Sequence, residues 1–310
     1  MKVVALAGGV GGAKFADGLA HCLSPEELTI IVNTGDDFEH FGLHISPDLD
    51  TVCYTLAGIA NPQSGWGRMD ESWITFAELK AMGAPDWFQL GDRDLATHLE
   101  RTRRLGEGET LSQITAHFCR VWGVKHPILP MSDDSIRTWV LTEEGELPFQ
   151  EYFVRYHFQP AVRDFQFRGV DSARPAPGVL AALSQADILL FCPSNPFVSI
   201  DPILAVDGVR QACLQKRVIA ISPIVGGKAI KGPAAKMFVE LGIPPSPLAV
   251  AQHYAGLING LVLDNLDADY AIEIQQLGIG TLVTNTLMNI PAERYNLAHT
   301  ILKAIEGGKL

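Results

Sequence analysis

The chain has 310 residues, of which 47% are hydrophobic, enough to bury a sizeable core within one large α/β domain. Its formal net charge of −11 argues against a broad nucleic-acid or membrane-surface footprint, because either would require a basic field to attract phosphates. A small anionic ligand is compatible with this charge, since a local group of amides and a few cations can hold one.

Apolar segments and cysteines indicate the compartment. The apolar run from Val3 to Ala7 is interrupted by glycines before it reaches signal-peptide length. No other apolar stretch approaches the roughly 20 residues of a spanning helix. We therefore expect a soluble, cytoplasmic protein. The 5 cysteines are scattered and form no C-x-x-C pair, which predicts buried free thiols rather than a disulfide framework or a zinc site.

The N-terminal segment predicts a strand, a helix and a second strand. Residues 3–7 are a buried apolar run, and Phe15, Leu19 and Leu23 then recur every four residues, as on one face of a helix. Residues 28–32 are a second apolar run. This β-loop-α-β order predicts a parallel sheet with right-handed crossovers.

Two segments interrupt that pattern. Residues 51–126 are helical and irregular, with turn signals and no obvious strand, so we expect a helical insertion packed beside the sheet. Residues 127–170 contain β-formers that alternate around Glu144 and Gly145, which predicts a β-hairpin excursion.

The parallel pattern resumes in the second half of the chain. Residues 186–196 ("ADILLFCPSNP") and 217–227 ("RVIAISPIVGG") each place a buried strand before a polar or glycine-rich loop. A last strand candidate, residues 279–288, precedes a helix from about Ala292. The predicted fold class is α/β, with a Rossmann-like, mostly parallel sheet flanked by helices in a single domain, residues 1–310. Ligand sites in such sheets lie at the carboxyl ends of the strands, so the loops there should converge on one crevice.

The first strand runs into "LAGGVGGAKF", residues 6–15, in which 4 glycines within 5 positions precede a lysine. A nucleotide-triphosphate loop requires G-x-x-x-x-G-K-[ST], but Phe15 occupies the position of the hydroxyl residue. A dinucleotide fingerprint requires G-x-G-x-x-G, and Lys14 stands at its third glycine. A general anion site remains, because glycines allow close backbone approach and the helix expected to begin near Ala13 offers free amides and a positive dipole end. The candidate residues are Gly9, Gly11, Gly12 and Lys14.

The loop after the second strand, residues 33–51, is the most charged. Four aspartates lie at or beyond the end of that strand, namely Asp36, Asp37, Asp48 and Asp50. Converging carboxylates could hold Mg²⁺, which prefers oxygen ligands and substrate phosphates. A solvated turn or helix cap is the alternative interpretation, but two acidic pairs beside a glycine-rich loop favour a functional site. His40 and His44 lack the further ligands of a zinc site, so we interpret them as polar loop histidines.

A third block is "WFQLGDRDLATH", residues 87–98. Asp92 and Asp94 flank Arg93, and Asp94 suits an N-cap for the helix that follows. Taken alone, this block is explained by a capped helix with a surface ion pair.

Two late loops resemble anion sites in outline. In "CPSNPFVSIDP", Ser194 and Asn195 could bond a base edge or a phosphate. In "SPIVGGKAIKGPAAK", two glycines precede Lys228 and Lys231. A plain connection between strand and helix is an equally good interpretation of both loops.

In combination these blocks resemble a known family. "GGVGGAK", "NTGDDFEHFGLHISPDLDT", "LGDRDLATH", "PSNPFVSIDPIL" and "SPIVGGKAIKG" occur in the order found in the 2-phospho-L-lactate transferases of coenzyme F-420 biosynthesis. The resemblance covers essentially the whole chain. A related branch, the sugar-nucleotide-binding gluconeogenesis-factor proteins, shares the glycine-rich opening and the general fold, and we expect that branch to lack the "GDRDLATH" block.

The resemblance implies a reaction. A 2-phospholactyl or enolpyruvyl phosphate unit would pass from a guanosine-diphosphate-linked donor to the ribityl hydroxyl of the deazaflavin FO, with release of GMP. The family match places Asp50 and Arg93 at FO, with Asp50 also close enough to the reacting centre to orient or deprotonate the hydroxyl. It makes Asp36 and Asp50 the Mg²⁺ ligands.

The same match assigns the donor site. Backbone amides, a lysine and a metal are the usual means of neutralising charge in phosphoryl-type transfers. The resemblance places the diphosphate at Gly9, Gly11, Gly12 and Lys14, and the guanosine end at Ser194 and Asn195, with Lys228 nearby.

Two other function classes remain open. One is a regulator that binds a sugar nucleotide without chemistry, and the other is a dinucleotide oxidoreductase, which the failed fingerprint and Asn33 in place of a ribose-binding acid disfavour. The residues do not distinguish a lactyl, enolpyruvyl or glyceryl donor. By analogy we expect a homodimer, for which residues 248–263 are a candidate seam, although core packing explains that segment equally well.

Overall fold

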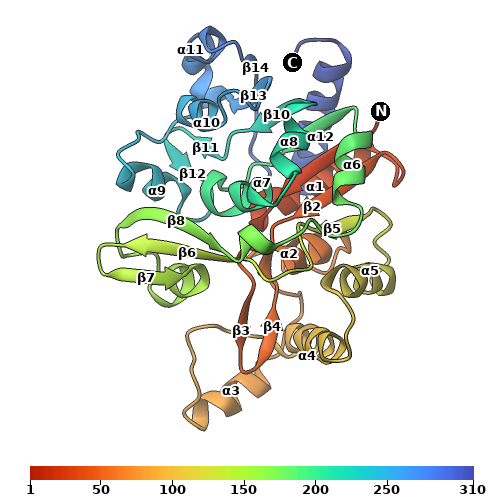
Figure 1. Ribbon diagram of the computed structural model, residues 1–310, viewed down its shortest axis with the longest axis vertical. Coiled ribbons are helices and arrows are strands. Elements are labelled where there is room, and N and C mark those ends of the chain that lie inside the picture. Colours follow the sequence, from red (N-terminus) through yellow and green to blue (C-terminus); the bar gives the residue numbers. More distant parts are fainter.

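A parallel sheet of 7 strands runs through the centre of the molecule (Figure 1). The computed structural model describes residues 1–310. From edge to edge the strands are β14 (Gly280–Thr284), β13 (Gly260–Asp264), β10 (Arg217–Ile221), β9 (Ile188–Phe191), β1 (Val3–Ala7), β2 (Leu28–Val32) and β5 (Ile128–Pro130). Every neighbouring pair is parallel. The predicted Rossmann-like α/β fold class is therefore confirmed.

Alternating side chains of each strand feed two separate cores. On β1, Val4 and Leu6 belong to one buried cluster, whereas Val3, Ala5 and Ala7 belong to the other. Successive side chains of a strand point to opposite faces, so a strand covered on both sides must be apolar throughout. This is why the uninterrupted apolar runs at 3–7 and 28–32 predict their strands with the observed boundaries.

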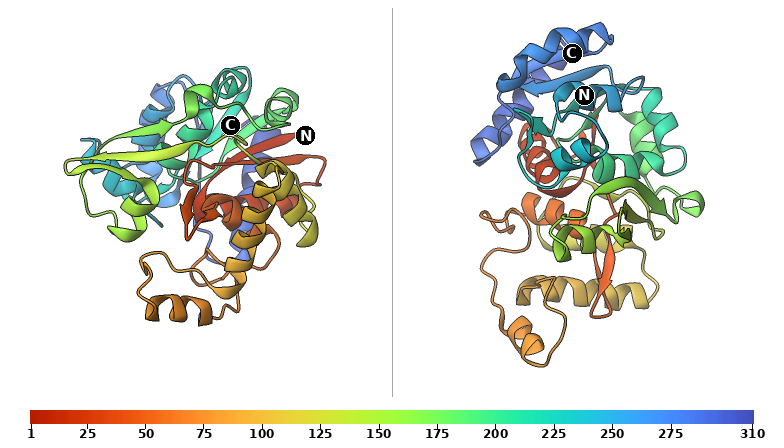
Figure 2. Two further views of the ribbon diagram at one scale, coloured as in Figure 1. Left: turned by 60° about the horizontal axis from the view of Figure 1, so that its bottom comes forward. Right: turned by 90° about the vertical axis from the view of Figure 1, so that its left-hand side faces the viewer.

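Helices cover both faces of the sheet (Figures 1 and 2). One face is covered by α1 (Gly9–Cys22), α2 (Pro47–Leu56), α5 (Leu111–Val121) and α12 (Pro291–Glu306). The other core receives side chains from α6 (Val179–Gln185), α7 (Asp201–Ala205), α8 (Val209–Leu214), α9 (Ala234–Glu240), α10 (Pro247–His253) and α11 (Ala271–Gln276). None of these helices combines the length and apolar character needed to cross a membrane.

The predicted hairpin belongs to a second, antiparallel sheet of 3 strands. Strand β6 (Arg137–Thr142) pairs with β7 (Gly145–Pro148) on one side and with β8 (Val162–Arg168) on the other. A short π-helix, η1 (Glu151–Arg155), lies between β7 and β8. The chain coils there and buries Tyr152 in the core, so the excursion contains more than the predicted hairpin.

The remaining short elements are β11 (Ile224–Val225), β12 (Lys228–Ala229), η2 (Val170–Ser172), η3 (Pro196–Ile200) and η4 (Asn265–Tyr270). Residues 248–263 lie largely in α10 and β13, whose apolar side chains fill one of the two cores. Core packing thus accounts for the segment considered as a dimer seam. The cysteines are free thiols, and all but Cys22 are buried.

Residues 38–45 and 59–106, on either side of α2, form the part of the molecule that extends away from the sheet (Figure 2). A hairpin of β3 (Phe38–His40) and β4 (Leu43–Ile45) projects from the end of the sheet, and α4 (Asp92–Gly106) packs beside it. Helix α3 (Ile74–Ala81) lies at the far tip and buries none of its side chains. The hairpin falls within the predicted acidic loop and was not anticipated, because its strands are only 3 residues each.

Candidate functional site

A cavity of about 700 Å³ opens at the carboxyl ends of the central strands. Its walls include the loops that follow β1, β2, β9 and β10, represented by Gly9, Asp36, Asn195 and Ser222. The strand order of the sheet reverses between β1 and β9, where open α/β sheets form their ligand crevice. The expected convergence of these loops on one crevice is confirmed.

The glycine-rich turn is packed tightly against the loop after β9. The Gly8 amide donates a hydrogen bond to Ser194 Oγ (3.1 Å), and the Ser194 hydroxyl donates to the Gly8 carbonyl oxygen (2.8 Å). A Cβ on Gly12 would lie 2.6 Å from Ser194 Oγ, and one on Gly11 would overlap the Pro193 carbonyl oxygen. The absence of side chains at these glycines therefore allows the turn to pack closely against the loop after β9. The two hydrogen bonds of Ser194 hold the turn in place.

Helix α1 begins at Gly9, four residues before the expected start near Ala13. Gly9 adopts a φ of +60°, a value that favours glycine, and Gly8 caps the helix without a side-chain hydrogen bond. The expectation failed because glycine's low helix propensity was taken as a barrier to helix formation. Tertiary contacts overcome that barrier here, so the first-turn amides of α1 lie in the cavity wall.

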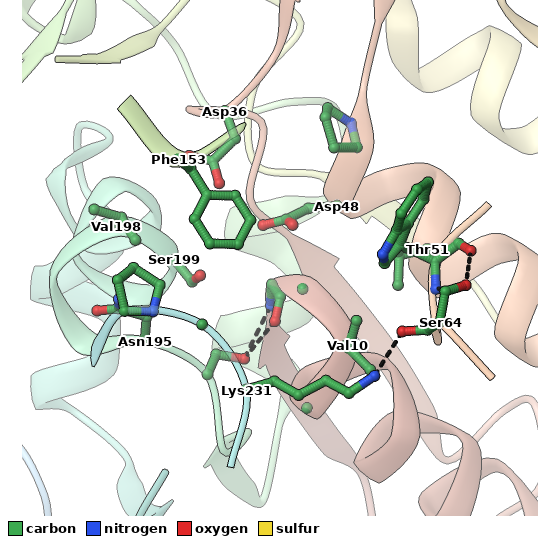
Figure 3. Close-up of a pocket in the computed structure, with 18 of the residues that line it drawn as sticks. Val10, Asp36, Asp48, Thr51, Ser64, Phe153, Asn195, Val198, Ser199 and Lys231 are labelled. Atoms are coloured by element: carbon green, nitrogen blue, oxygen red, sulfur yellow. Dashed lines mark hydrogen bonds between the residues drawn. The ribbon is translucent and has the colours of Figure 1, made fainter. Parts of the chain in front are cut away.

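Two lysines approach each other beside this helix end. Burial, followed by the positive charges of Lys231 and Arg294, lowers the pKa of Lys14. Lys231 extends past Val10 and donates a hydrogen bond to the Ser64 carbonyl oxygen at 2.6 Å (Figure 3). Both lysines line the cavity, which makes this wall cationic.

Lys228, the other predicted cation, is exposed on β12 and does not line the cavity. Asn195 does line it, but its side chain is engaged elsewhere. The Asn195 carbonyl accepts from the Phe197 amide (3.0 Å), which caps η3, and its Nδ2 faces the sulfur of Met237 (3.2 Å).

The four aspartates of the acidic segment are each at most 7% exposed, and all but Asp37 line the cavity. Asp48 and Asp50 lie in the first turn of α2, where the helix dipole favours negative charge. Asp36 and Asp48 point into the same part of the cavity (Figure 3). Asp48 accepts a hydrogen bond from Asn33 Nδ2 (2.9 Å), whereas Asp36 Oδ1 has no hydrogen-bond partner.

Burial and the repulsion of neighbouring carboxylates disfavour the charged forms of Asp36 and Asp48. Burial, and next the charge of Asp48, raise the pKa of Asp36 well above its ordinary value. Burial raises the pKa of Asp48 to about 6, although hydrogen bonds from Asn33 and the Gly9 amide favour its charged form. A cation between the two carboxylates would relieve both effects.

Asp37 and the two histidines of the segment have structural partners. Asp37 Oδ2 accepts hydrogen bonds from the Ser46 hydroxyl (2.8 Å) and lies 3.0 Å from His44 Nε2. His40 packs among aromatic rings, with ring centroids 5.2 Å from Trp87 and 5.7 Å from Phe88. The two histidines lie on β3 and β4 rather than in a loop.

Asp50 belongs to a different cluster from Asp36 and Asp48. Its Oδ1 is ion-paired with the guanidinium of Arg101, while its Oδ2 has no hydrogen-bond partner. His98 Nδ1 lies 3.7 Å from Asp50 Oδ2. Burial raises the pKa of Asp50, and the charge of Arg101 offsets part of that rise. Because Asp50 lines the cavity and this buried oxygen has no partner, the carboxylate is suited to accept a hydrogen bond or a proton from a hydroxyl bound there.

The start of α4 differs from the expectation. Its N-cap is Gly91 rather than Asp94, and the Glu71 carboxylate accepts from the Arg93 amide (2.7 Å) and the Asp94 amide (2.8 Å). Asp94 instead accepts a hydrogen bond from the Tyr54 hydroxyl (2.7 Å) and lines the cavity. The side chain of Arg93 is exposed and does not line the cavity.

The donor set fits a magnesium ion only when substrate completes it. No group of three or more His, Cys, Asp or Glu side chains converges to hold a metal by itself. Mg²⁺ typically binds one or two carboxylates together with waters and substrate phosphates, which matches Asp36 and Asp48. The unpaired Oδ1 of Asp36 is a free ligand atom of the required chemistry.

Sequence reasoning missed three residues of the site. His98 and Arg101 stand four and seven positions after Asp94, on the face of α4 that meets α2. Residues at this spacing lie on one face of a helix, so the spacing could have indicated that His98 and Arg101 lie beside Asp94. Lys231 was noticed as a cation but passed over in favour of Lys228, and only the loop conformation distinguishes them.

The sequence of this chain is similar to those of known proteins. The family model described as "2-phospho-L-lactate transferase CofD" matches residues 3–279. A phosphoenolpyruvate transferase from Thermobifida fusca is 46% identical over 88% of this chain and 89% of its own length. One from Kitasatospora aureofaciens is 44% identical over 99% of this chain and 98% of its own length.

Solved structures share the fold at lower identity. The crystal structure of a UPF0052 family member from Bacillus halodurans superimposes with a TM-score of 0.63 and 17% identity. The match covers 97% of this chain and 98% of that one.

Proposed function

The chain belongs to the CofD family of 2-phospho-L-lactate transferases, which serve coenzyme F-420 biosynthesis, and is thus a transferase; on this premise we propose its donor, acceptor and leaving group. The donor is a three-carbon acid esterified to the terminal phosphate of guanosine diphosphate, the acceptor is the ribityl hydroxyl of the deazaflavin FO, and the leaving group is GMP. The observation that carries this proposal is a single cavity lined by the glycine-rich start of α1, by two lysines and by buried carboxylates.

We propose the enolpyruvyl unit as the transferred group. The relatives from Thermobifida fusca, Kitasatospora aureofaciens and a Mycobacterium species are named phosphoenolpyruvate transferases, at 46%, 44% and 41% identity. The family description names phospholactate instead, so the lactyl donor is the competitor to be tested.

The proposed transfer is a displacement at the phosphorus that bears the three-carbon unit. The FO hydroxyl oxygen forms a new P–O bond, and the bond from that phosphorus to the bridging oxygen breaks. GMP leaves with the bond's electron pair. The hydroxyl proton passes to Asp50 Oδ2, the carboxylate oxygen that has no partner.

The cationic wall holds the donor in this proposal. Gly9 and Gly11 in the first turn of α1, together with Lys14 and Lys231, border the diphosphate, whereas Gly12 packs against Ser194 and does not line the cavity. Ser194 and Asn195 border the guanosine end, where the Ser194 hydroxyl acts by locking the glycine turn. These groups neutralise charge on the donor and on departing GMP.

We propose Asp36 and Asp48 as the magnesium ligands. The sequence-based pair was Asp36 with Asp50, but Asp50 Oδ1 is engaged by Arg101, while Asp36 and Asp48 repel each other directly. When bound, Mg²⁺ supplies Lewis-acid neutralisation of phosphate oxygens. Asp50 is then left to orient and deprotonate the acceptor.

Arg93 is proposed to bind the acceptor at the cavity rim. It lies in the first turn of α4, next to Asp94, which lines the cavity. An exposed guanidinium there can contact the part of FO that extends from the cavity. A planar fork is suited to a planar polar partner.

The test is mass spectrometry of a reaction with purified protein, FO, Mg²⁺ and an equal mixture of the enolpyruvyl and lactyl guanosine diphosphates. We expect a phosphoester of FO and one equivalent of GMP, with the enolpyruvyl product in excess. Unmodified FO with both donors and with the glyceryl donor would overturn the proposal. Binding of a UDP-sugar without turnover, measured by calorimetry, would then identify a nucleotide-binding regulator.

A further inference from the structure

The guanidinium of Arg101 contacts the proposed catalytic carboxylate without reaching the cavity. Arg101 is 2% exposed, lies on α4 and is not among the cavity-lining residues. It is ion-paired with Asp50 Oδ1. Its Nη1 donates to the His44 carbonyl oxygen (3.2 Å) and lies 3.1 Å from His98 Nδ1. Arg101 thus ties together α2, α4 and strand β4.

These contacts determine which nitrogen of His98 carries hydrogen. Because an arginine can only donate, His98 Nδ1 is the acceptor in its contact with Arg101, and the hydrogen of the neutral ring resides on Nε2. Nε2 lies 3.5 Å from Asp94 Oδ1, on the opposite side of the ring from Asp50. His98 therefore does not donate to Asp50 Oδ2, although Nδ1 is only 3.7 Å away.

The consequence is a carboxylate with one occupied and one free oxygen. An arginine and a carboxylate often pair through two parallel hydrogen bonds, which would occupy both oxygens. Here Arg101 takes only Oδ1, and its second nitrogen is committed to His44 and His98. Asp50 lines the cavity, and its Oδ2 is consequently buried without a partner.

We propose that Arg101 is a positioning residue for the transfer, which holds Asp50 by one oxygen and engages His98 so that Oδ2 stays available to the acceptor hydroxyl. The inference rests on the proposed function. Lysine cannot replace Arg101 in this role, because a single ammonium does not reproduce a fork that reaches Asp50, His98 and the His44 carbonyl together. Packing of the guanidinium over the Phe118 ring, 5.8 Å from its centroid, fixes the direction of the fork.

The experiment compares Arg101→Ala with wild type in the FO transfer assay, with guanidinium added to both. We expect kcat to fall by about 10–100-fold, as for a misplaced reacting group, while KM for FO and for the donor changes less than about threefold. Millimolar guanidinium should restore a large part of kcat, and ethylammonium should restore less. Arg103→Ala, two residues further along α4 and 51% exposed at its side chain, is the matched control and should behave as wild type.

A double-variant cycle separates positioning from a loss of folded protein. If Arg101 acts through Asp50, then Arg101→Ala in an Asp50→Asn background should cost no further activity. Additive losses without guanidinium rescue, or a kcat within twofold of wild type, would overturn the inference. Should Arg101→Ala not fold, Arg101→Lys keeps the buried charge, and we expect the same loss of kcat from a folded protein.

The wild-type reaction distinguishes this inference from the function on which it rests. Absence of transfer by wild type overturns the proposed function and the inference with it. Transfer by wild type and equally by Arg101→Ala and Arg101→Lys overturns the inference alone.

Discussion

The two walls of the cavity are built on opposite principles. At the glycine-rich turn, Ser194 forms hydrogen bonds with the backbone amide and carbonyl of Gly8. The space that a side chain would need at Gly11 and Gly12 is occupied by neighbouring protein atoms. At the acidic wall, Asp36 Oδ1 and Asp50 Oδ2 are buried without hydrogen-bond partners. An unsatisfied buried group costs on the order of 1–3 kcal/mol, more if charged.

This difference indicates that the glycine turn contributes mainly to stability, whereas the acidic residues are suited to the proposed chemistry. The glycine turn contributes fixed backbone dipoles, and its sequence is required by packing. The acidic wall holds buried carboxylate oxygens without partners, which lower stability and which the proposed mechanism uses as a metal ligand and a proton acceptor. Substitutions should therefore move stability at one wall and activity at the other.

The largest effect is expected at Asp50. Asp50→Asn keeps the shape of the side chain but removes the charge that accepts a proton, so transfer should fall by about 10²-fold or more. Steady-state kinetics with FO and the enolpyruvyl donor measure this. Asp207→Asn, at an exposed position, is the control. Near-normal turnover by Asp50→Asn would remove this carboxylate from the mechanism.

The second effect is a loss of stability at the glycine turn. In Gly11→Ala the new methyl group would overlap the Pro193 carbonyl oxygen, and backbone must move. We expect a loss of about 3 kcal/mol in the free energy of unfolding, at the upper end for overpacking.

Urea denaturation measures the change at Gly11. Gly106→Ala is the matched control, since nothing lies within 4 Å of its added Cβ and its φ is not positive. This control should be neutral or slightly stabilising. If both variants unfold at the same urea concentration as wild type, the turn is not held by close packing.

Features that depend only on residues close together in the chain could be predicted from the sequence. The buried strands β1 and β2 follow from unbroken apolar runs, and the convergence of loops follows from the rule for parallel sheets. The acidic residues Asp36 and Asp50 were identified because they follow a strand end. Such inferences need only neighbours in the chain.

Contacts between distant segments could not be read in this way. Glu71 caps α4 from more than 20 residues upstream, and Asp92 in turn accepts from the amides of Ile74 and Thr75 that begin α3. The pairing of Asp50 with Arg101 spans 51 residues. Local propensity contains no information on which of several arginines meets a given aspartate.

A third prediction concerns pH and the acidic wall. Asp48 has a folded pKa of about 6 against an ordinary value of 3.8, so the folded state holds this proton more tightly than the unfolded state. The contribution of this group to stability is therefore highest at low pH and falls as pH rises from about 4 to about 6. Asp48→Asn should remove this decline and stabilise the metal-free protein at pH 8 by about 3 kcal/mol.

Urea denaturation at pH 5 and pH 8 in the presence of a chelator tests this. The free energy of unfolding of Asp48→Asn should exceed that of wild type by more at pH 8 than at pH 5. Added Mg²⁺ should stabilise wild type more than the variant. A variant less stable than wild type at pH 8 would mean that hydrogen bonds from Asn33 and Gly9 outweigh burial.

The fourth prediction compares the two lysines of one loop region. Lys231 lines the cavity and Lys228 does not, so Lys231→Ala should raise KM for the guanosine-diphosphate-linked donor about tenfold, equivalent to about 1.4 kcal/mol. Lys228→Ala should stay within about twofold of wild type. The opposite ranking in donor titrations would restore the sequence-based assignment of Lys228.

The smallest effect is expected at Arg93, which does not line the cavity but precedes Asp94, a residue that does. Its side chain is exposed, so water screens its interactions, and a contact to FO there contributes under about 1 kcal/mol. Arg93→Lys keeps the charge but loses the planar fork, so KM for FO should rise about threefold while KM for the donor is unchanged. Arg103→Lys is the matched control on the same helix, and it should change neither constant. Equal weakening of both substrates by Arg93→Lys would place this residue outside the acceptor site, because a contact to FO alone does not change the binding of the donor at the glycine-rich turn.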